Sequence, residues 1–203
     1  NPIMNNDYLI ISRIFFQISA PHIHASALEL LSSFSSKGSK VLDIGSGTGY
    51  VTACLARMGA EVIGIEHMKG LVEQSLKNIR RNHSDLLESK QVRILVGDAR
   101  ELDKRIEGTK FDAIHCGAAV EKLPQYMWSS LKDGGRIVLP IGPEDGPQYL
   151  TYVDKKSEQV PSNKDMHMLF RVLYVPITNT KWQEDRWQHI TVDPFPDEVD
   201  NDE

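Results

Sequence analysis

The sequence predicts an α/β protein built on a doubly wound, mostly parallel sheet. From Lys40 onward, apolar runs typical of strands alternate with helical patterns, which is the signature of βαβ units. The first run leads directly into a glycine-rich loop, VLDIGSGTGY, over residues 41–50. Two further strand-like runs follow the fifth strand without a helix between them, so we expect an antiparallel strand pair at the C-terminal edge of the sheet.

The individual elements follow from local patterns of hydrophobicity. Five short runs predict strands: KVLDI (40–44), EVIGI (61–65), VRILV (92–96), FDAIH (111–115) and GRIVLP (135–140). Helical spacing of apolar residues predicts helices over 24–34, 50–58, 69–82 and 121–132. The runs PQYLTYV (147–153) and MHMLFRVLYVPI (166–177) predict the antiparallel pair, with 154–165 as an exposed hairpin loop.

Length and composition indicate one domain with short extensions. The chain has 203 residues, 40% of them hydrophobic, which suits one α/β domain and is too little for two. We expect a short atypical N-terminal segment (1–16), a domain over 17–190 and an acidic tail over 191–203. The last eleven residues hold six acids and two prolines, a composition typical of a disordered, solvated tail.

Charge and cysteine content exclude several classes of partner. The formal net charge is −5, so the chain offers no basic face in bulk for nucleic acid. Cys54 and Cys116 form no CxxC pair, which argues against a disulfide framework and favours small core residues in a reducing compartment. No apolar run approaches the ~20 residues of a membrane span. We therefore expect a cytoplasmic monomer with no nucleic-acid or membrane partner.

The glycine loop predicts a nucleotide-like cofactor. A strand, a glycine loop and a helix in this order present backbone N–H groups at the carboxyl edge of a Rossmann-like sheet. Gly45, Gly47 and Gly49 occupy the first, third and fifth positions, and Tyr50 stands where a dinucleotide fingerprint needs its third glycine. This spacing disfavours NAD. The GxGxG loop with Asp43 before it resembles motif I of the class I S-adenosylmethionine-dependent methyltransferases.

Acids at three successive strand ends strengthen this resemblance, which places Asp43 near the methionyl ammonium of the cofactor. Glu66 ends the second strand, where its carboxylate can accept both ribose hydroxyls. Asp98, in VGDAR, follows the third strand and can accept from the adenine amino group, with the Ala99 backbone beside it. The alternative interpretation is that each acid only caps a helix.

The segment after the fourth strand bears on the methyl acceptor. Methyltransferases that act on amide or amine nitrogen often carry an Asn/Asp-Pro-Pro-aromatic motif there, whereas this chain reads HCGAAVEKLP. Gly117, Ala118 and Ala119 leave room for a backbone or a flexible segment in place of a planar base. Nitrogen methylation is therefore disfavoured.

The stretch QISAPHIHASALELL (17–31) carries the most specific signal. Together with VLDIGSGTGYVTACLARMG, VIGIEH, LVGDAR, FDAIHCGAA, GGRIVLPIGP and RVLYVPIT, it resembles the protein-L-isoaspartate (D-aspartate) O-methyltransferase family. The resemblance runs from residue 17 to 187. It implies methyl transfer from S-adenosyl-L-methionine, with S-adenosyl-L-homocysteine as product, to isoaspartyl residues of peptides and proteins. The isoaspartyl α-carboxylate is ionised at neutral pH, so alignment and exclusion of water replace a general base.

The resemblance assigns roles residue by residue. Ser19 is the catalytic candidate, because its hydroxyl would donate to the acceptor carboxylate at the transfer point. The cofactor would contact Ile18, Ser19, His24, Asp43, Gly45, Gly47, Gly49, Glu66, His67, Asp98, Ala99, Thr178 and Gln183. The peptide would contact Ala20, Pro21, His22, Val175 and Pro176. No metal site is expected, since His22 and His24 lack further ligands.

Departures from the family pattern keep alternatives open. Family members usually carry a further helical subdomain and a loop before the Ser-Ala-Pro-His block, whereas only 18 residues precede Ser19 here. One alternative is therefore a catalytically impaired adaptor that binds cofactor or damaged protein. Another is a small-molecule carboxyl methyltransferase, although no aromatic lid for its acceptor is identifiable. Activity toward D-aspartyl residues is also open.

Overall fold

The computed structural model describes residues 19–101, 106–157, 159–162 and 165–177. The predicted N-terminal segment (1–16) and acidic tail (191–203) lie outside these residues, so the domain bounds stay predictions. Within the described residues no helix is long and apolar enough to cross a bilayer.

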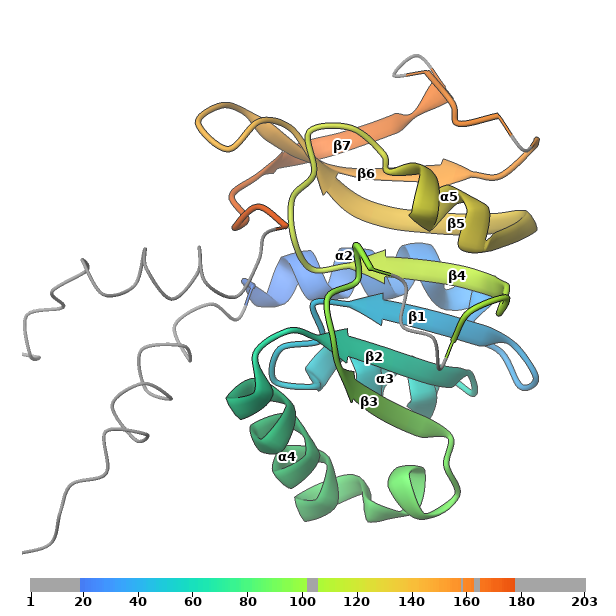
Figure 1. The fold of residues 1–203 in the computed structure, drawn as a ribbon, viewed down its shortest axis with the longest axis vertical. Helices are drawn as coiled ribbons and strands as arrows, with labels where there is room; N and C mark the ends of the chain where they lie inside the picture. The colour runs from blue at the N-terminus through green and yellow to red at the C-terminus, as the bar shows by residue number, and fades with distance from the viewer. Residues whose placement is uncertain (1–18, 102–105, 158, 163–164, 178–203) are drawn as a thin grey trace, which may run out of the picture.

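A seven-stranded sheet forms the centre of the described part of the chain, in the order β3-β2-β1-β4-β5-β6-β7 (Figure 1). β1 to β5 pair in parallel, and β6 and β7 continue the sheet in antiparallel pairing. The predicted α/β fold with its antiparallel finish is confirmed. The strands are β1 (Lys40–Ile44), β2 (Glu61–Glu66), β3 (Val92–Val96), β4 (Phe111–Cys116), β5 (Leu131–Ile141), β6 (Gln148–Asp154) and β7 (His167–Val172).

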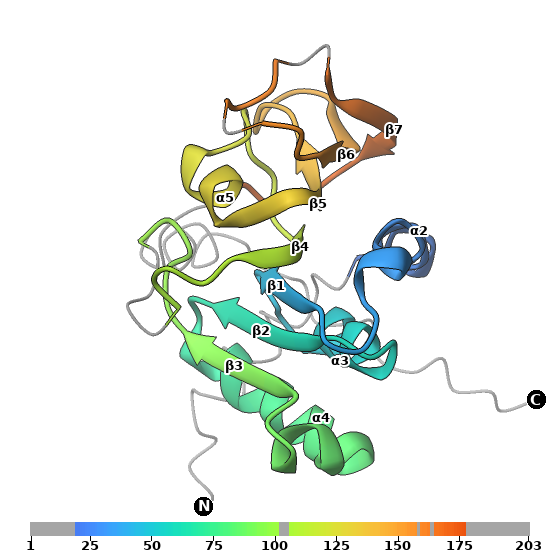
Figure 2. The same cartoon turned by 90° about the vertical axis from the view of Figure 1, so that its right-hand side faces the viewer.

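Helices cover both faces of the sheet. The two views show α2, α3 and α4 on one face and α5 on the other (Figures 1 and 2). Successive strand residues point to opposite faces of the sheet: Val41 packs against α2, α3 and α4, and Leu42 packs on the face that α5 covers. The helices are α2 (Pro21–Leu31), α3 (Tyr50–Arg57), α4 (Lys69–Glu88) and α5 (Gln125–Ser130).

The helix predicted over 121–132 was the least accurate element. The structure holds only Gln125–Ser130 in helical form, because Pro124 stands at the N-cap and favours an extended conformation before the helix. Leu131 already belongs to β5, where it pairs with Phe111 of β4. The strand therefore begins four residues earlier than its apolar pattern indicates, and Gly134 follows with a φ of 77°.

Other boundaries also differ from the prediction. The strand predicted over 166–177 is observed only as β7 over His167–Val172, and the first helix ends at Leu31, three residues before its predicted end. α2 begins at Pro21, since proline is well tolerated in the first turn of a helix. α4 continues to Glu88, six residues beyond its predicted end, and its backbone is non-helical at His83, where φ is −146° and ψ is 41°. None of the differences in the helices moves a strand end at the carboxyl edge of the sheet.

Arg136 on β5 anchors α2 against the sheet. Its guanidinium donates to the backbone carbonyl of Leu30 at 3.1 Å and to the carboxylate of Asp154 at 2.6 and 2.9 Å. The same group lies over the rings of Phe34 and Tyr152, 5.0 and 4.4 Å from their centroids. These contacts hold the C-terminal end of the helix whose N-terminal end follows Ser19.

Candidate functional site

The carboxyl ends of β1 and β4 meet where the strand order reverses. β1 pairs with β2 on one side and with β4 on the other, and open α/β sheets bind ligands in the crevice at such a switch point. The strand ends are tightly apposed: Gly117 N donates to Ile44 O at 2.7 Å, and a Cβ on Gly117 would lie 2.9 Å from Gly45 O. A pocket opens directly at these glycines.

The glycine loop forms one wall of the pocket. Gly45 donates its N–H to Ile65 O at 2.8 Å, which ties the loop to the end of β2. Gly49 is the N-cap of α3 with a φ of 81°, and a Cβ there would lie 3.1 Å from both Ser75 and Ile79 on α4. Gly45 and Gly47 line the pocket, whereas Gly49 does not. The third glycine therefore serves the packing of α3 against α4.

A buried polar cluster forms the floor of the pocket behind the loop. The Asp43 side chain has no solvent exposure, and its two oxygens accept from different partners. Thr52 Oγ1 donates to Oδ2 at 2.5 Å, and His115 Nδ1 donates to Oδ1 at 2.7 Å. Asp43 and His115 lie opposite each other in the β1–β4 register, and both line the pocket. A buried carboxylate held in this way keeps a fixed orientation toward a ligand.

Glu66, at the end of β2, fixes the neighbouring backbone. Its Oε2 accepts from Gly47 N at 3.1 Å and its Oε1 accepts from Met68 N at 2.9 Å, so one carboxylate holds both the glycine loop and the residue before α4. Since a carboxylate has about four acceptor positions, Glu66 retains capacity for ligand hydroxyls. His67 lies beside it, with Nε2 3.9 Å from Oε1.

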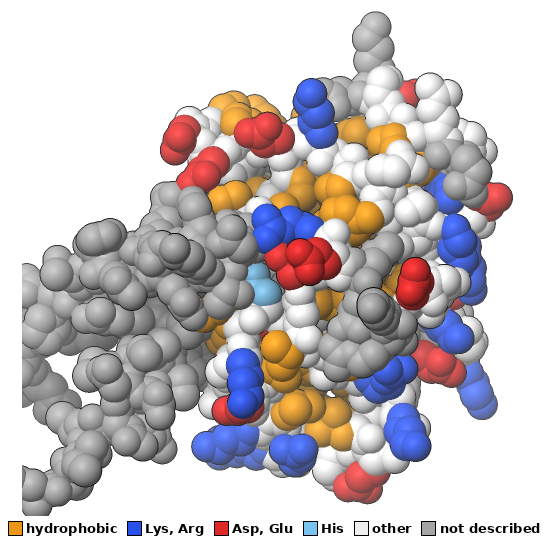
Figure 3. Space-filling view, viewed as in Figure 1, with side chains coloured by type: hydrophobic (Ala, Val, Ile, Leu, Met, Phe, Trp, Pro, Cys, Tyr) orange, Lys and Arg blue, Asp and Glu red, His pale blue; other side chains and the backbone are white. Residues whose placement is uncertain are grey.

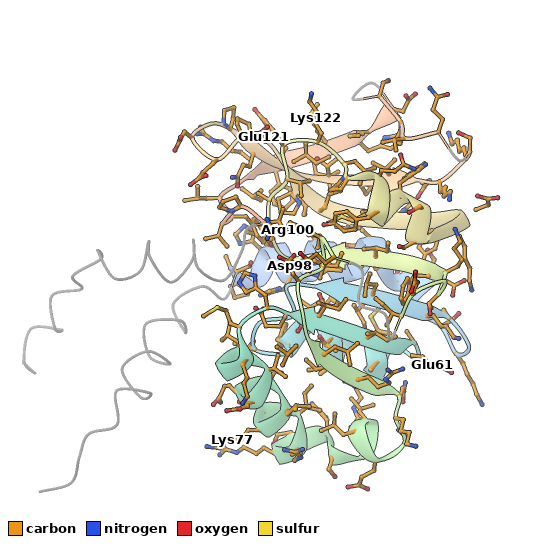
Figure 4. All side chains as sticks on the ribbon, in the orientation of Figure 1. Glu61, Lys77, Asp98, Arg100, Glu121 and Lys122 are labelled. Carbon is orange, nitrogen blue, oxygen red and sulfur yellow. The ribbon has the colours of Figure 1, made fainter. Side chains whose placement is uncertain are left out.

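Asp98 follows β3 and lines the same pocket with Gly97 and Ala99. Its carboxylate forms a bidentate ion pair with Arg100, whose Nε lies 2.9 and 3.1 Å from Oδ1 and Oδ2. The hydrogen bonds from Arg100 hold the pKa of Asp98 below its usual value. Figure 4 shows the two side chains together on this side of the molecule, away from Glu61 at the start of β2.

Ser19 and His24 approach the pocket from the start of α2. The buried His24 Nε2 has no hydrogen-bond partner among the described residues, and the ring bonds to the backbone of Ser19 through its other nitrogen. Burial lowers the pKa of His24, so the ring is neutral at pH 7 and Nε2 is an open acceptor. The side chain of Ser19 interacts with the Tyr174 hydroxyl.

Residues after β7 cross back over the end of β4 and close the pocket. Ala119 N donates to Val175 O at 2.8 Å, and Ile177 N donates to Ala119 O at 2.8 Å. Tyr174, Val175, Pro176 and Ile177 all line the pocket. The pocket therefore has walls from the beginning, the middle and the end of the described chain.

Comparison with known proteins identifies the family. The sequence pattern of the family "Protein-L-isoaspartate(D-aspartate) O-methyltransferase (PCMT)" matches residues 6–182. The chain belongs to this family. Protein-L-isoaspartate O-methyltransferase of Caenorhabditis elegans is 40% identical over 173 residues, which cover 84% of this chain and 73% of the relative. Protein-L-isoaspartate O-methyltransferase 1 of Arabidopsis thaliana is 44% identical over 170 residues, covering 82% and 71%.

A solved structure supports the same family and fold. A Plasmodium falciparum protein assigned as a protein-L-isoaspartate O-methyltransferase, in complex with S-adenosyl-L-homocysteine, matches this chain with a TM-score of 0.70 and 34% identity. The match covers 80% of this chain and 76% of the other. The resemblance drawn from the Ser-Ala-Pro-His block is confirmed, and so are the methyltransferase activity and its cofactor. The adaptor alternative is not favoured, because the relatives carry methyltransferase names.

Most of the residues predicted to form the site of this methyltransferase come together in the structure. Those that line the pocket are Ser19, His24, Asp43, Gly45, Gly47, Glu66, His67, Asp98, Ala99, Val175 and Pro176. Ala20, Pro21 and His22 do not line it; they are exposed at the start of α2, where the His22 ring lies 6.1 Å from that of Phe170. Ile18, Thr178 and Gln183 lie outside the described residues.

Several pocket residues of the methyltransferase were missed by the sequence analysis. Ser46, in the quoted glycine loop, has a buried hydroxyl with no partner among the described residues, and its place between two loop glycines was the available signal. Tyr50 lies at the start of α3, with its ring 5.3 Å from that of His24. His115 is the last residue of the predicted run FDAIH (111–115) and lies opposite Asp43 in the sheet. Tyr174 gives no local signal, because its place depends on the return of the chain after β7.

The remaining predictions on titratable groups concern metals and thiols. No group of three or more metal-ligating side chains occurs within the described ranges. Both cysteines are free: Cys116 is buried, and Cys54 is partly buried. Burial raises the pKa of Cys116 to about 12, which makes it an inert core thiol.

The arrangement can hold a ligand with several donors along one line of strand ends. Asp43, Glu66 and Asp98 lie at the carboxyl ends of β1, β2 and β3 and present carboxylate oxygens to one pocket, while the Ser46 hydroxyl can donate to a ligand. On the face seen in Figure 3, acidic and basic side chains are interspersed around apolar ones. Inside the pocket, the carboxylates of Asp43, Glu66 and Asp98 can accept from the donor groups of a ligand.

Proposed function

We propose that this methyltransferase moves the methyl group of S-adenosyl-L-methionine to the free α-carboxylate of L-isoaspartyl residues in damaged proteins. The observation that carries the proposal is a pocket with three carboxylates at successive strand ends, which Ser19 also lines from the segment just before α2. The S–CH₃ bond breaks as the C–O bond forms, so the sulfonium becomes a thioether and the carboxylate becomes a methyl ester. No proton has to move in this step.

We place the parts of the cofactor along the pocket by the acceptors that it offers. Asp43, held rigidly by Thr52 and His115, suits the methionyl ammonium. Glu66 suits the ribose hydroxyls, because each of its oxygens has one backbone donor and room for another. Asp98 suits the amino group of adenine. The neutral His24 and the unpartnered Ser46 hydroxyl would complete the contacts.

Ser19 is proposed to act on the acceptor. Its side chain lies near the Tyr174 hydroxyl, and both residues line the pocket. A hydroxyl that donates to the attacking carboxylate would align that oxygen with the methyl carbon, and alignment is the main source of acceleration in such a transfer. The exposed Ala20, Pro21 and His22 and the backbone of Val175 and Pro176 would hold the peptide around it.

The test compares three peptides that differ at one residue: L-isoaspartyl, D-aspartyl and normal L-aspartyl. With labelled S-adenosylmethionine, we expect transfer to the isoaspartyl peptide and none to the aspartyl peptide, and the D-aspartyl peptide defines the breadth of the site. Ser19→Ala should lower transfer strongly while the dissociation constant of S-adenosyl-L-homocysteine stays within about twofold. Equal transfer to all three peptides, or unchanged turnover in Ser19→Ala, would contradict these assignments.

We also propose that the enzyme acts in the cytoplasm as a monomer without a nucleic-acid partner. The net charge of −5 supports the last point. Light scattering on the purified chain tests the oligomeric state, because a dimer would show twice the 22.9 kDa mass of the chain.

A further inference from the structure

Arg100 holds Asp98 by an unusually complete set of contacts for a partly exposed pair. Arg100 Nε lies 2.9 Å from Oδ1 and 3.1 Å from Oδ2, and Nη2 donates to Oδ2. The backbone N–H of Arg100 also donates to Oδ1 at 2.9 Å. The side chains are 38% and 25% exposed, so neither group is sealed in the core. Both lie at the carboxyl edge of the sheet in Figure 4.

Among the described residues, Oδ2 is the oxygen of the Asp98 carboxylate with the more open acceptor position. An ionised carboxylate offers about four acceptor positions. The backbone N–H and Nε–H of Arg100 both approach Oδ1 at 2.9 Å, whereas Oδ2 accepts from Nη2–H and has only a longer contact of 3.1 Å with Nε. Because Asp98 lines the pocket, the open position is available to a ligand there.

We propose that Arg100 is a positioning residue for the base of the cofactor. Arg100 fixes the plane of the Asp98 carboxylate and directs an acceptor position of Oδ2 toward the ligand. This position can accept one N–H of the amino group of a 6-aminopurine, and a 6-oxopurine has no such N–H at that place. The resulting selection for a 6-aminopurine is electrostatic, since a 6-oxo group would place its oxygen against the carboxylate oxygen. The inference rests on the proposed placement of adenine at Asp98, and it adds a residue that does not itself line the pocket.

The geometry favours positioning over competition. If Arg100 blocked the adenine site, it would have to release Asp98 before the cofactor could bind, and removing it would tighten binding. A bidentate guanidinium–carboxylate pair is planar and directional, and it leaves outward-facing lone pairs free. The two mechanisms therefore predict opposite signs for the effect of an Arg100 substitution on affinity.

The test uses two ligands, S-adenosyl-L-homocysteine and its deaminated analogue S-inosyl-L-homocysteine. Calorimetry gives both dissociation constants for the wild type, Arg100→Gln, Arg100→Lys and Asp98→Asn. Arg57→Gln is the matched control, because Arg57 forms a similar bidentate pair with Asp85 at 2.6 and 2.7 Å and does not line the pocket. Thermal unfolding checks that each variant is folded.

We expect the wild type and Arg57→Gln to prefer the adenosyl ligand by at least about tenfold, the ratio that a hydrogen bond to a charged acceptor contributes. Arg100→Gln should bind the adenosyl ligand more weakly and reduce the preference at least about threefold. Arg100→Lys should do the same, because lysine keeps the charge and loses the planar fork. A general loss of stability would weaken both ligands equally and leave the ratio unchanged.

Three outcomes would overturn the proposal in distinguishable ways. An unchanged ratio in Arg100→Gln would show that Asp98 needs no positioning. A higher affinity for the adenosyl ligand in Arg100→Gln would show that Arg100 competes with it. A wild type without preference, matched by an unchanged Asp98→Asn, would show that adenine is not placed at Asp98, which would leave the methyltransferase activity itself untouched.

Discussion

Thr52→Val tests whether the buried cluster at the pocket floor depends on its hydrogen bonds. Thr52 Oγ1 donates to Asp43 Oδ2 at 2.5 Å, and neither residue has solvent exposure. Valine keeps the shape of threonine and removes the donor, so a carboxylate oxygen loses its partner in a place that water does not reach. A hydrogen bond to a charged group contributes about 1.5–3 kcal/mol. We expect the free energy of unfolding to fall by about 2 kcal/mol.

Urea unfolding of the wild type, Thr52→Val and Thr52→Ser provides the measurement. Serine keeps the donor and removes one buried methyl group, a change that costs about 1 kcal/mol. The valine variant should therefore be the less stable of the two, with a midpoint of thermal unfolding about 4–8 °C below the wild type. It should also bind S-adenosyl-L-homocysteine more weakly, because Asp43 loses its fixed orientation. A valine variant within about 0.5 kcal/mol of the wild type would refute the reasoning.

Three further predictions use other features of the site. Gly117→Ala should lower the free energy of unfolding by about 1–3 kcal/mol and weaken S-adenosyl-L-homocysteine binding, because the new Cβ would lie 2.9 Å from Gly45 O; equal stability in urea would contradict the close approach. Burial lowers the pKa of His24 from 6.5, so the unfolded chain takes up its proton first and stability should decrease as the pH falls below 6.5. His24→Gln should flatten this part of the stability profile, and an unchanged profile would exclude His24 as its source. A thiol reagent should modify no more than one cysteine of the native protein, because burial raises the pKa of Cys116 to about 12, and a count of two would show that the core opens.

Local sequence patterns predicted a strand correctly where a short apolar run is bounded by polar residues or glycine. The runs 40–44 and 92–96 correspond to β1 and β3 residue for residue. β1 is buried from Val41 to Ile44, whereas β3 lies at the edge of the sheet with Arg93 and Val96 exposed, so a short run rich in β-branched and apolar residues predicted both strands. The prediction of a helix over 121–132 was wrong at its C-terminal end, because Leu131 and Lys132 belong to β5 in the structure. Leu131 pairs with Phe111, 20 residues away, and a pairing of this kind leaves no trace in the local pattern.

The site was predictable to the extent that it depends on strand ends. Carboxyl ends of neighbouring parallel strands share one edge, so Asp43, Glu66 and Asp98 had to lie near each other once the strands were placed. Their partners were not predictable. His115 lies 72 residues from Asp43, and its contact depends on the register of β1 against β4. Tyr174 reaches Ser19 only because the chain crosses back after β7.

Because the chain crosses back over the end of β4, the pocket is complete only when both ends of the described chain have folded. Ser19 and the stretch from Tyr174 to Ile177 come from opposite ends of the described chain, yet they close one pocket. A partly synthesised chain could form β1, β2 and β3 before that closing stretch exists. Ligand affinity therefore reports on assembly of the whole domain, and ligand at about 100 times its dissociation constant would add about 2.7 kcal/mol to the finished fold.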